Sequence, residues 1–267
     1  MLEDISFILK QVKEIIQKGG VVAFTGAGIS VESGVPAFRG ESGLWEKYDS
    51  NIYGNILGLG TTFLISPQKV ASFVMDVYGT VLNARPNPAH LILARMEQAG
   101  LLDAVITQNI DNLHQEAGNG NVIELHGNLF IMKCMKCGNR KKMEKQEIEE
   151  MLSSINKSLY FRFKLFRTFL SLFPKCSCKG QMRPDIVLFG EMVPEEAMED
   201  SFSEIERCNS LLMIGTSGVV YPAASLPYYA RKNKKIVIEV NEEQTSLSSI
   251  ADYKLLGKAS EILPKLL

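Results

Sequence analysis

Short runs of apolar residues recur along the chain, and each is followed by glycine or a polar residue. Runs of this length, bounded in this way, are typical of buried strands. The runs that we expect to form strands are 21–24, 104–107, 122–127, 186–189, 211–214 and 236–240. Segments with apolar residues at helical spacing alternate with them, at 2–18, 89–98, 195–207 and 222–232. This alternation predicts an α/β fold with a parallel sheet that helices cover on both faces.

Two regions depart from this alternation. Residues 40–62 are rich in Gly, Asn, Ser and Tyr without a strong period, so we expect loop with short helices there, and a helix that starts at Ser66-Pro67. Residues 144–153 look helical. Residues 160–167 mix aromatic and basic side chains, which fits a strand or an amphipathic segment. Such a segment could contact a partner or a membrane surface, but we expect it to pack on its own zinc module, which the cysteine pairs at 134–137 and 176–178 predict.

A glycine-rich turn follows the first predicted strand. Gly26-Ala27-Gly28 comes directly after residues 21–24, and Ser30 is a candidate N-cap for the next segment. This layout suits a nucleotide, because glycine lets the backbone approach a pyrophosphate and a helix N-terminus attracts its charge. Since Val31 fills the third glycine position of the dinucleotide fingerprint, an ordinary strand-to-helix turn stays open. Arg39, on the next loop, could neutralise a phosphate.

Small or polar residues follow one predicted strand after another. In an open α/β sheet, ligands bind beyond the carboxyl ends of the strands. We therefore interpret Asn109 and Asp111 as site residues, although Asp111 could instead cap the next helix, and His114 as a satisfied helix residue. His126 is either structural or a group that transfers protons. The residues that mark the strand ends are Gly26, Gln108, His126, Gly215 and Asn241.

The cysteines predict a metal site. Cys134-x-x-Cys137 and Cys176-x-Cys178 are two close pairs, which is typical of a structural tetrahedral zinc site, whereas Cys208 stands alone and is read as core. Five cysteines without a disulfide pattern favour a reducing compartment, and we expect an intracellular protein, cytoplasmic or, in a eukaryote, nuclear.

Length and charge narrow the class of protein further. The chain has 267 residues, of which 46% are hydrophobic, enough for a large core in one or two domains. Its formal net charge of -1 gives no support for a nucleic-acid partner. We see no secretion signal and no apolar run long enough to span a membrane.

Taken together, the motifs resemble the sirtuin family, the NAD-dependent protein lysine deacylases. They occur in the family's order and span nearly the whole chain: 26–30, 34–40, 107–114, 125–127, the two cysteine pairs, 189–191, 215–217 and 240–241. The resemblance implies a discontinuous Rossmann-type NAD-binding domain at 1–39, 87–130 and 184–267. It also implies a smaller domain, made of a helical module at 40–86 and a zinc-binding module at 131–183.

The resemblance also assigns roles to residues. His126 would be the general base, and Asn109 would share the catalytic site. Val187, Phe189 and Gly190 would line the acyl-lysine tunnel and pair with the substrate peptide. One zinc ion would be held by Cys134, Cys137, Cys176 and Cys178. NAD would be bound by Gly26, Ala27, Gly28, Phe38, Arg39, Gln108, Asn109, Ile110, Asp111, Gly215, Thr216, Ser217 and Asn241.

The implied reaction is NAD-dependent removal of acyl groups, acetyl first, from lysines of proteins or peptides. Its products are deacylated lysine, nicotinamide and O-acyl-ADP-ribose. Alternatives are a long-chain deacylase, a mono-ADP-ribosyltransferase and an NAD-sensing scaffold with little turnover. The presence of His126 and Asn109 argues against the scaffold.

Two departures from the family pattern stand out. Ala37 replaces an Asp that many members carry, with an uncertain effect on the cofactor loop. Segment 74–79 lacks the Tyr and Arg pair of members that remove acidic acyl groups, so we do not expect a preference for succinyl.

Overall fold

The chain folds into two compact units. The computed structural model describes residues 5–37 and 43–267. One unit comprises Met1–Ala37, Arg85–His126 and Val193–Leu267, and the other comprises Phe38–Ala84 and Gly127–Met192. The sequence placed the last boundary at 184, earlier than Val193, because it read the intervening apolar run as a strand of the large sheet.

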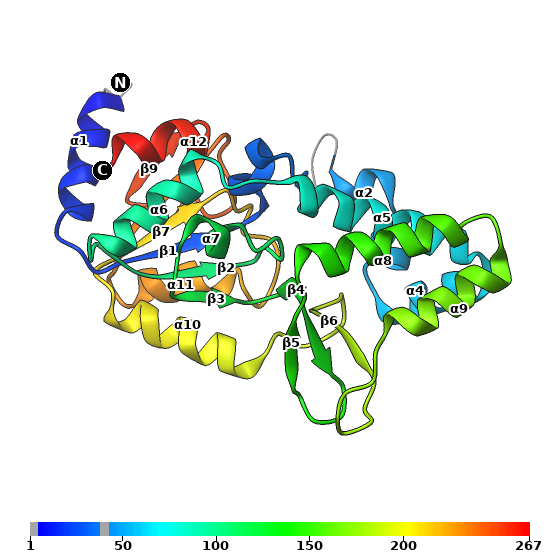
Figure 1. The fold of residues 1–267 in the computed structure, drawn as a ribbon. Helices are drawn as coiled ribbons and strands as arrows, with labels where there is room; N and C mark the ends of the chain where they lie inside the picture. The colour runs from blue at the N-terminus through cyan, green and yellow to red at the C-terminus, as the bar shows by residue number, and fades with distance from the viewer. Residues whose placement is uncertain (1–4, 38–42) are drawn as a thin grey trace. The chain divides into compact units, whose positions relative to one another are not determined.

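The first unit contains a six-stranded parallel sheet (Figure 1). Its central strands β1 and β7 are buried along their whole length, because helices cover both faces. The predicted parallel sheet is therefore confirmed. In spatial order the strands are β3 (Val122–Glu124), β2 (Leu102–Thr107), β1 (Val21–Thr25), β7 (Ser210–Ile214), β8 (Ile236–Asn241) and β9 (Tyr253–Leu256).

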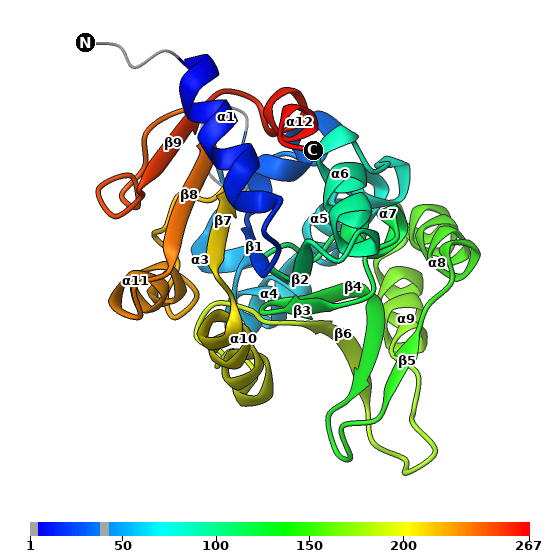
Figure 2. The ribbon, with the colours of Figure 1, turned by 90° about the vertical axis from the view of Figure 1, so that its left-hand side faces the viewer.

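Alternate side chains of β1 enter two separate apolar cores. Val21 and Ala23 join one cluster, and Val22 and Phe24 join the other. Figure 2 shows the two layers of helices on either side of the sheet. The first core is closed by α1 (Ile5–Ile16), α6 (Pro88–Gln98), α12 (Ala259–Ile262) and η2 (Leu263–Lys265), and the second by α10 (Glu195–Arg207) and α11 (Ser225–Lys232). The short elements η1 (Ala27–Ser33) and α7 (Leu113–Ala117) follow β1 and β2.

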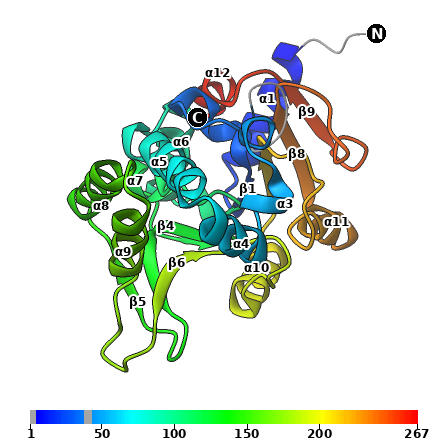
Figure 3. The ribbon, with the colours of Figure 1, turned by 90° about the vertical axis from the view of Figure 1, so that its right-hand side faces the viewer.

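The second unit combines a helical module with a small antiparallel sheet (Figure 3). The sheet has the order β5 (Arg140–Lys142), β4 (Gly127–Cys134), β6 (Met182–Ile186). Helices α5, α8 and α9 share one apolar cluster, whose buried members are Val70, Ala71, Ile155, Leu165 and Phe169. The helices are α2 (Leu44–Lys47), α3 (Ser50–Tyr53), α4 (Ile56–Ile65), α5 (Pro67–Asn83), α8 (Lys145–Ser158) and α9 (Arg162–Leu172).

Two expectations for this unit were wrong. Of the predicted buried strand 186–189, only Ile186 lies in a strand. It is the last residue of β6, an edge strand of the antiparallel sheet that carries Pro184. Proline is tolerated at a sheet edge, where its missing N–H breaks no ladder bond. Residues 160–167, read as a strand or an amphipathic segment, begin helix α9, which packs on the helical module and not on the cysteine cluster. Among the described residues, none of the helices combines the length and apolar character that crossing a bilayer requires.

Candidate active site

The turns after β1 and β7 interlock through their backbones. A Cβ at Gly26 would lie 2.7 Å from the Gly215 carbonyl oxygen, and one at Gly28 would lie 2.6 Å from the Gly215 Cα. The Gly26 N–H donates to Ile214 O, and the Gly28 N–H donates to Gly215 O. The glycines are thus required by this close approach. Ser30 is not the N-cap that we predicted, because the 3₁₀ helix η1 already begins at Ala27, with Gly26 as its cap.

Ser30 instead joins a buried polar cluster at the carboxyl end of the sheet. Its hydroxyl donates to Asp111 Oδ2 at 2.7 Å and accepts from Asn109 Nδ2 at 3.0 Å. The same amide donates to Gly26 O, and Asp111 Oδ1 accepts the N–H of Leu113 at the start of α7. Burial raises the pKa of Asp111. Both predicted residues, Asn109 and Asp111, are therefore fixed by η1, and Asp111 also binds the first N–H of α7, whose N-cap residue is Asn112.

His114 packs behind this cluster. The Thr25 hydroxyl donates its proton to Thr107 Oγ1 at 2.8 Å, so the contact of 2.9 Å to His114 Nε2 must be donated by the imidazole. Burial holds the pKa of His114 well below its ordinary value, so the ring is neutral. His114 is thus a structural helix residue, as the sequence suggested, but it is not fully satisfied, because its buried Nδ1 has no hydrogen-bond partner among the described residues.

His126 is held differently. Its Nδ1 lies 2.9 Å from the main-chain oxygen of Gln108, and a carbonyl oxygen can only accept. The proton therefore sits on Nδ1, and Nε2 carries a lone pair. Burial lowers the pKa of His126 below 6.5, and the bond to Gln108 opposes this shift. The Gln108 amide donates to Thr216 Oγ1 at 2.9 Å, which links the ends of β2 and β7.

A second buried cluster lies after β7 and β8. Asn241 Nδ2 donates to Thr216 O and to Glu239 Oε1, both at 3.2 Å, and Thr245 Oγ1 donates to the same carboxylate oxygen at 2.6 Å. Glu239 is fully buried. Sequence reasoning missed this residue, although a charged side chain inside an apolar strand is a visible signal, since such a group is rarely buried without partners.

Two acceptor atoms at this edge of the sheet fit a ligand that carries donors. Asn109 Oδ1 and Glu239 Oε2 are buried, and neither has a hydrogen-bond partner among the described residues. A buried acceptor without a partner is costly, so a bound donor group would stabilise it. The carboxamide and ribose hydroxyls of NAD are donors of this kind. Ala27 and Ile110, also predicted to contact NAD, are partly exposed, whereas Phe38 and Arg39 lie outside the described residues.

In the second unit, the turn after β6 carries the predicted substrate residues. The Phe189 N–H donates to Gly54 O at 2.7 Å, and a Cβ at Gly54 would lie 2.3 Å from the Phe189 ring. The ring also lies 5.6 Å from Trp45, centroid to centroid. Gly190 has a φ of +87°, which glycine adopts without strain. Val187 is half-buried, and nearly half of Phe189 remains exposed.

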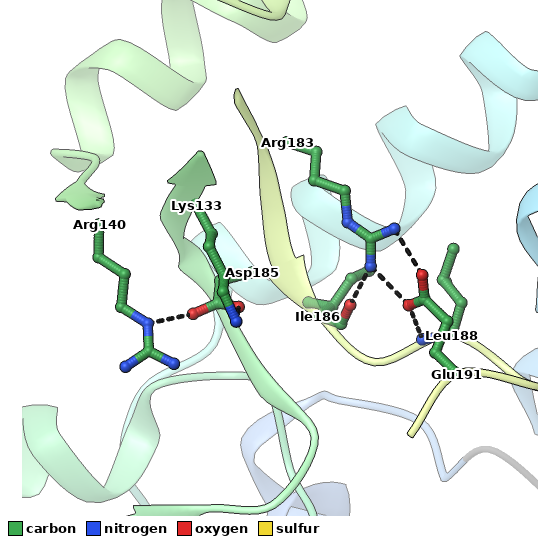
Figure 4. Close-up of polar contacts among 7 residues, drawn as sticks. All are labelled: Lys133, Arg140, Arg183, Asp185, Ile186, Leu188 and Glu191. Atoms are coloured by element: carbon green, nitrogen blue, oxygen red, sulfur yellow. Dashed lines mark hydrogen bonds and ion pairs between the residues drawn. The ribbon is translucent and has the colours of Figure 1, made fainter. Parts of the chain in front are cut away.

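An ion pair closes this turn (Figure 4). Arg183 on β6 donates to both carboxylate oxygens of Glu191, at 2.7 and 2.5 Å, and to Ile186 O at 2.8 Å. Glu191 Oε2 also accepts the Leu188 N–H at 2.9 Å. Hydrogen bonding to Arg183 lowers the pKa of Glu191. The pair thus spans residues 186–191 and holds the turn that presents Val187, Phe189 and Gly190.

The four predicted zinc ligands come together. The sulfur atoms of Cys134, Cys137, Cys176 and Cys178 all lie within 4.8 Å of one another, with 3.5 Å between Cys134 and Cys178. Tetrahedral zinc with Zn–S bonds of about 2.3 Å spaces its sulfurs about 3.8 Å apart, so the cluster fits one zinc ion. Cys208 is buried elsewhere, and its Sγ donates to Ile205 O, in agreement with the predicted core role.

Comparison with known proteins places this arrangement in a family. The family model described as the Sir2 family matches residues 26–222, which include the cluster of Ser30, Asn109 and Asp111, His126 and all four cysteines. The chain belongs to the Sir2 family. Another Sir2 protein, the NAD-dependent protein deacylase of Pyrococcus furiosus, is 42% identical over 261 residues, which cover 97% of this chain and 96% of the relative.

Solved Sir2 structures have the same fold. A Sir2 homolog–NAD complex is 36% identical, with a TM-score of 0.76, and the match covers 96% of this chain and 91% of that one. A structure described as Sir2–p53 peptide–NAD+ is 32% identical, with a TM-score of 0.74, and the match covers 97% and 96%. The sirtuin resemblance inferred from the motifs is confirmed.

Proposed function

We propose that this protein removes acyl groups, acetyl first, from lysines of protein or peptide substrates, with NAD as co-substrate. Membership of the Sir2 family, the relative named as an NAD-dependent protein deacylase and the fold shared with the Sir2–p53 peptide–NAD+ structure support this activity. The observation that carries the proposal is the hydrogen bond of His126, which fixes the ring nitrogen that carries the proton. His126 presents an Nε2 lone pair while its Nδ1 proton is bonded to Gln108 O.

His126 is suited to act as a general base at neutral pH. Burial lowers its pKa, so the ring is neutral and able to accept a proton. Once Nε2 takes a proton from a ribose hydroxyl, the imidazolium is stabilised by the Gln108 carbonyl. Deacylation should therefore fall as the pH drops through the lowered pKa, below 6.5.

The remaining polar residues hold NAD. Asn109 and Asp111 would bind the nicotinamide half, and Thr216 with Asn241 the adenosine half. Glu239 Oε2 adds a buried acceptor on the adenosine side. NAD supplies an activated ribose carbon, and the acyl group ends on ADP-ribose, so the products are deacylated lysine, nicotinamide and O-acyl-ADP-ribose. In this proposal the first unit is the NAD-binding domain.

The second unit would bind the substrate. Strand β6 is an edge strand, so an extended peptide can add to it or to the turn that follows. Val187, Phe189 and Gly190 would contact the acyl-lysine. Cys134, Cys137, Cys176 and Cys178 would hold zinc as a folding element. We propose an intracellular protein, since four clustered thiols suit a reducing compartment, and we expect no direct contact with nucleic acid.

One assay tests this function. The protein is incubated with an acetyl-lysine peptide, with and without NAD, and peptide mass and nicotinamide release are followed together. The peptide should lose its acetyl group only with NAD, with one nicotinamide released for each acetyl lost. A mass gain of one ADP-ribose would instead show a mono-ADP-ribosyltransferase. An unchanged peptide would contradict the proposal.

A further inference from the structure

The outer side of helices α4 and α9 carries exposed apolar side chains. The C-terminal end of α4 contacts α9, since the Phe63 and Phe166 rings stack with centroids 5.0 Å apart and Arg162 donates to Leu64 O at 2.7 Å. The inner side of α9 packs against the helical module, because Leu165 and Phe169 are buried. The outer side also carries apolar residues, but these are exposed. We define the α4–α9 face by its exposed residues Leu57, Leu64, Ile65, Tyr160, Phe161 and Phe163.

Several of these side chains project almost completely into solvent. Phe163 is 89% exposed, Tyr160 is 87% exposed and Leu57 is 78% exposed. Leu57 and Leu64 are seven residues apart on α4, so they lie on one stripe of the helix. Grouped exposed apolar residues mark an interaction surface, whereas single ones are ordinary.

The charge around this face has one sign. The sequence contains no Asp or Glu from Met151 to Pro184, nor from Ser50 to Met75. Exposed basic residues do occur there, and Lys157, Lys164 and Arg167 make no ion pair among the described residues. The acidic residues of α8 lie in its first half, and its last turn carries Lys157. This asymmetry is local, because the whole chain has a net charge of -1.

We propose that the α4–α9 face docks the protein on the surface of a bilayer that contains acidic phospholipid. Aromatic and aliphatic side chains that project beside basic residues can enter the headgroup region while the cations meet lipid phosphates. The side chains stand out from the surface, and a fluid bilayer accepts such groups without a matching shape. An interface with a folded protein would need complementary packing around each ring.

The experiment is cosedimentation with vesicles. One set contains phosphatidylcholine alone, and the other contains equal parts of phosphatidylcholine and phosphatidylserine. The unmodified protein should bind the acidic set, less so as salt is added, and should leave the neutral set largely unbound. Neutralising Lys164→Gln with Arg167→Gln should weaken binding by about 25-fold, from about fivefold for each charge near an acidic surface.

Removing the projecting rings tests the apolar part. Tyr160→Ser with Phe163→Ser should weaken binding by about tenfold or more, because two rings no longer enter the interface. The matched controls lie on α1 and just after its end: Phe7 on α1 is also an exposed aromatic residue, and Lys10 on α1 and Lys18 beyond it are exposed cations. Phe7→Ser and the double variant Lys10→Gln, Lys18→Gln should bind as the unmodified protein does. All variants should keep its melting temperature, since every altered side chain is exposed.

Three results would overturn the proposal. The first is an unmodified protein that binds neither vesicle, and the second is binding that the α4–α9 variants leave unchanged. The third is a dimer, seen by sedimentation equilibrium, that Tyr160→Ser with Phe163→Ser dissociates, because a second copy would then cover the face.

Discussion

Arg183→Met should weaken binding of the substrate peptide without weakening binding of NAD. The variant keeps the apolar stem of the side chain but removes both bonds to Glu191 and the bond to Ile186 O. Glu191 is then left with the Leu188 N–H. The turn at 187–190 loses the Arg183 bonds that fix it on β6, so Phe189 and Gly190 are held less firmly, with the bond from the Phe189 N–H to Gly54 O remaining.

The size of the effect follows from the bonds lost. A hydrogen bond to a charged group contributes about 1.5–3 kcal/mol when buried. The side chains of Arg183 and Glu191 are 20% and 28% exposed, so solvent screening lowers the contribution of the pair to about 1–2 kcal/mol. That free energy corresponds to a change of about 5- to 30-fold in the equilibrium constant between the observed conformation of the turn and conformations in which it has left β6.

The assay is steady-state deacylation of an acetyl-lysine peptide, with peptide and NAD varied in turn. The KM for the peptide should rise by about 5- to 30-fold. The KM for NAD should stay within about twofold, because the predicted NAD residues other than Phe38 and Arg39 belong to the first unit, and none of them contacts Arg183. Arg140→Met is the matched control, since Arg140 pairs with Asp185 on the same strand at 2.7 Å without contact to the turn (Figure 4). Equal rises in both KM values, or an equal effect of Arg140→Met, would refute the reasoning.

Four further predictions concern the base, the metal, the acyl group and the glycine turn. His126→Ala should lower deacylation by about 10²- to 10⁴-fold while exchange of labelled nicotinamide survives better; an unchanged ratio of the two rates in a folded variant would count against the role. Cys137→Ala should lower zinc content and melting temperature, whereas Cys208→Ala should leave zinc content unchanged; full zinc in the first variant would exclude the site. A succinyl peptide should react far more slowly than an acetyl peptide, since an unpaired buried carboxylate costs several kcal/mol; similar turnover would reveal an unrecognised cation. Gly28→Ala should destabilise the protein by about 1–3 kcal/mol, because its Cβ meets the Gly215 backbone, whereas Gly60→Ala on α4, with nothing within 4 Å, should be neutral or stabilising in thermal unfolding; equal melting of the two would refute this.

Most of the large sheet could be predicted because its inner strands are apolar runs, whereas the edge strand β9, which is only partly buried, was not predicted. β1, β2, β7 and β8 are buried on both faces, and this burial leaves a mark in the sequence itself. The small antiparallel sheet has no such apolar pattern, since all three residues of β5 (Arg140–Lys142) are basic and exposed. Its outer strands β5 and β6 form by pairing with β4, next to the cysteine cluster, and such contacts between distant segments are not visible in the local sequence. The sheet to which residues 186–189 belong could not be predicted either, because a short apolar run is compatible with both sheets.

The candidate site was predicted by a positional rule. Residues after parallel strands meet at one edge, so Asn109, Asp111 and His126 could be singled out without coordinates. The partners of these residues could not be predicted, because they depend on contacts between distant segments. Ser30 on η1 bridges Asn109 and Asp111, and the buried Glu239 has one carboxylate oxygen, Oε2, without a hydrogen-bond partner among the described residues. The sequence therefore predicts which edge of the sheet carries the site, whereas the hydrogen bonds of the site residues are known only from the structure.

The peptide link between His126 and Gly127 is one of four places where the chain passes from one unit to the other, since segment Arg85–His126 belongs to the first unit and Gly127–Met192 to the second. Each side of this link is fastened to its own unit. The imidazole is bonded to Gln108 O, whereas the Gly127 Cα packs so tightly that a Cβ would lie 1.9 Å from Asp185 O. The torsion angles at this link therefore set the position of the proposed base relative to Gly127, the first residue of β4.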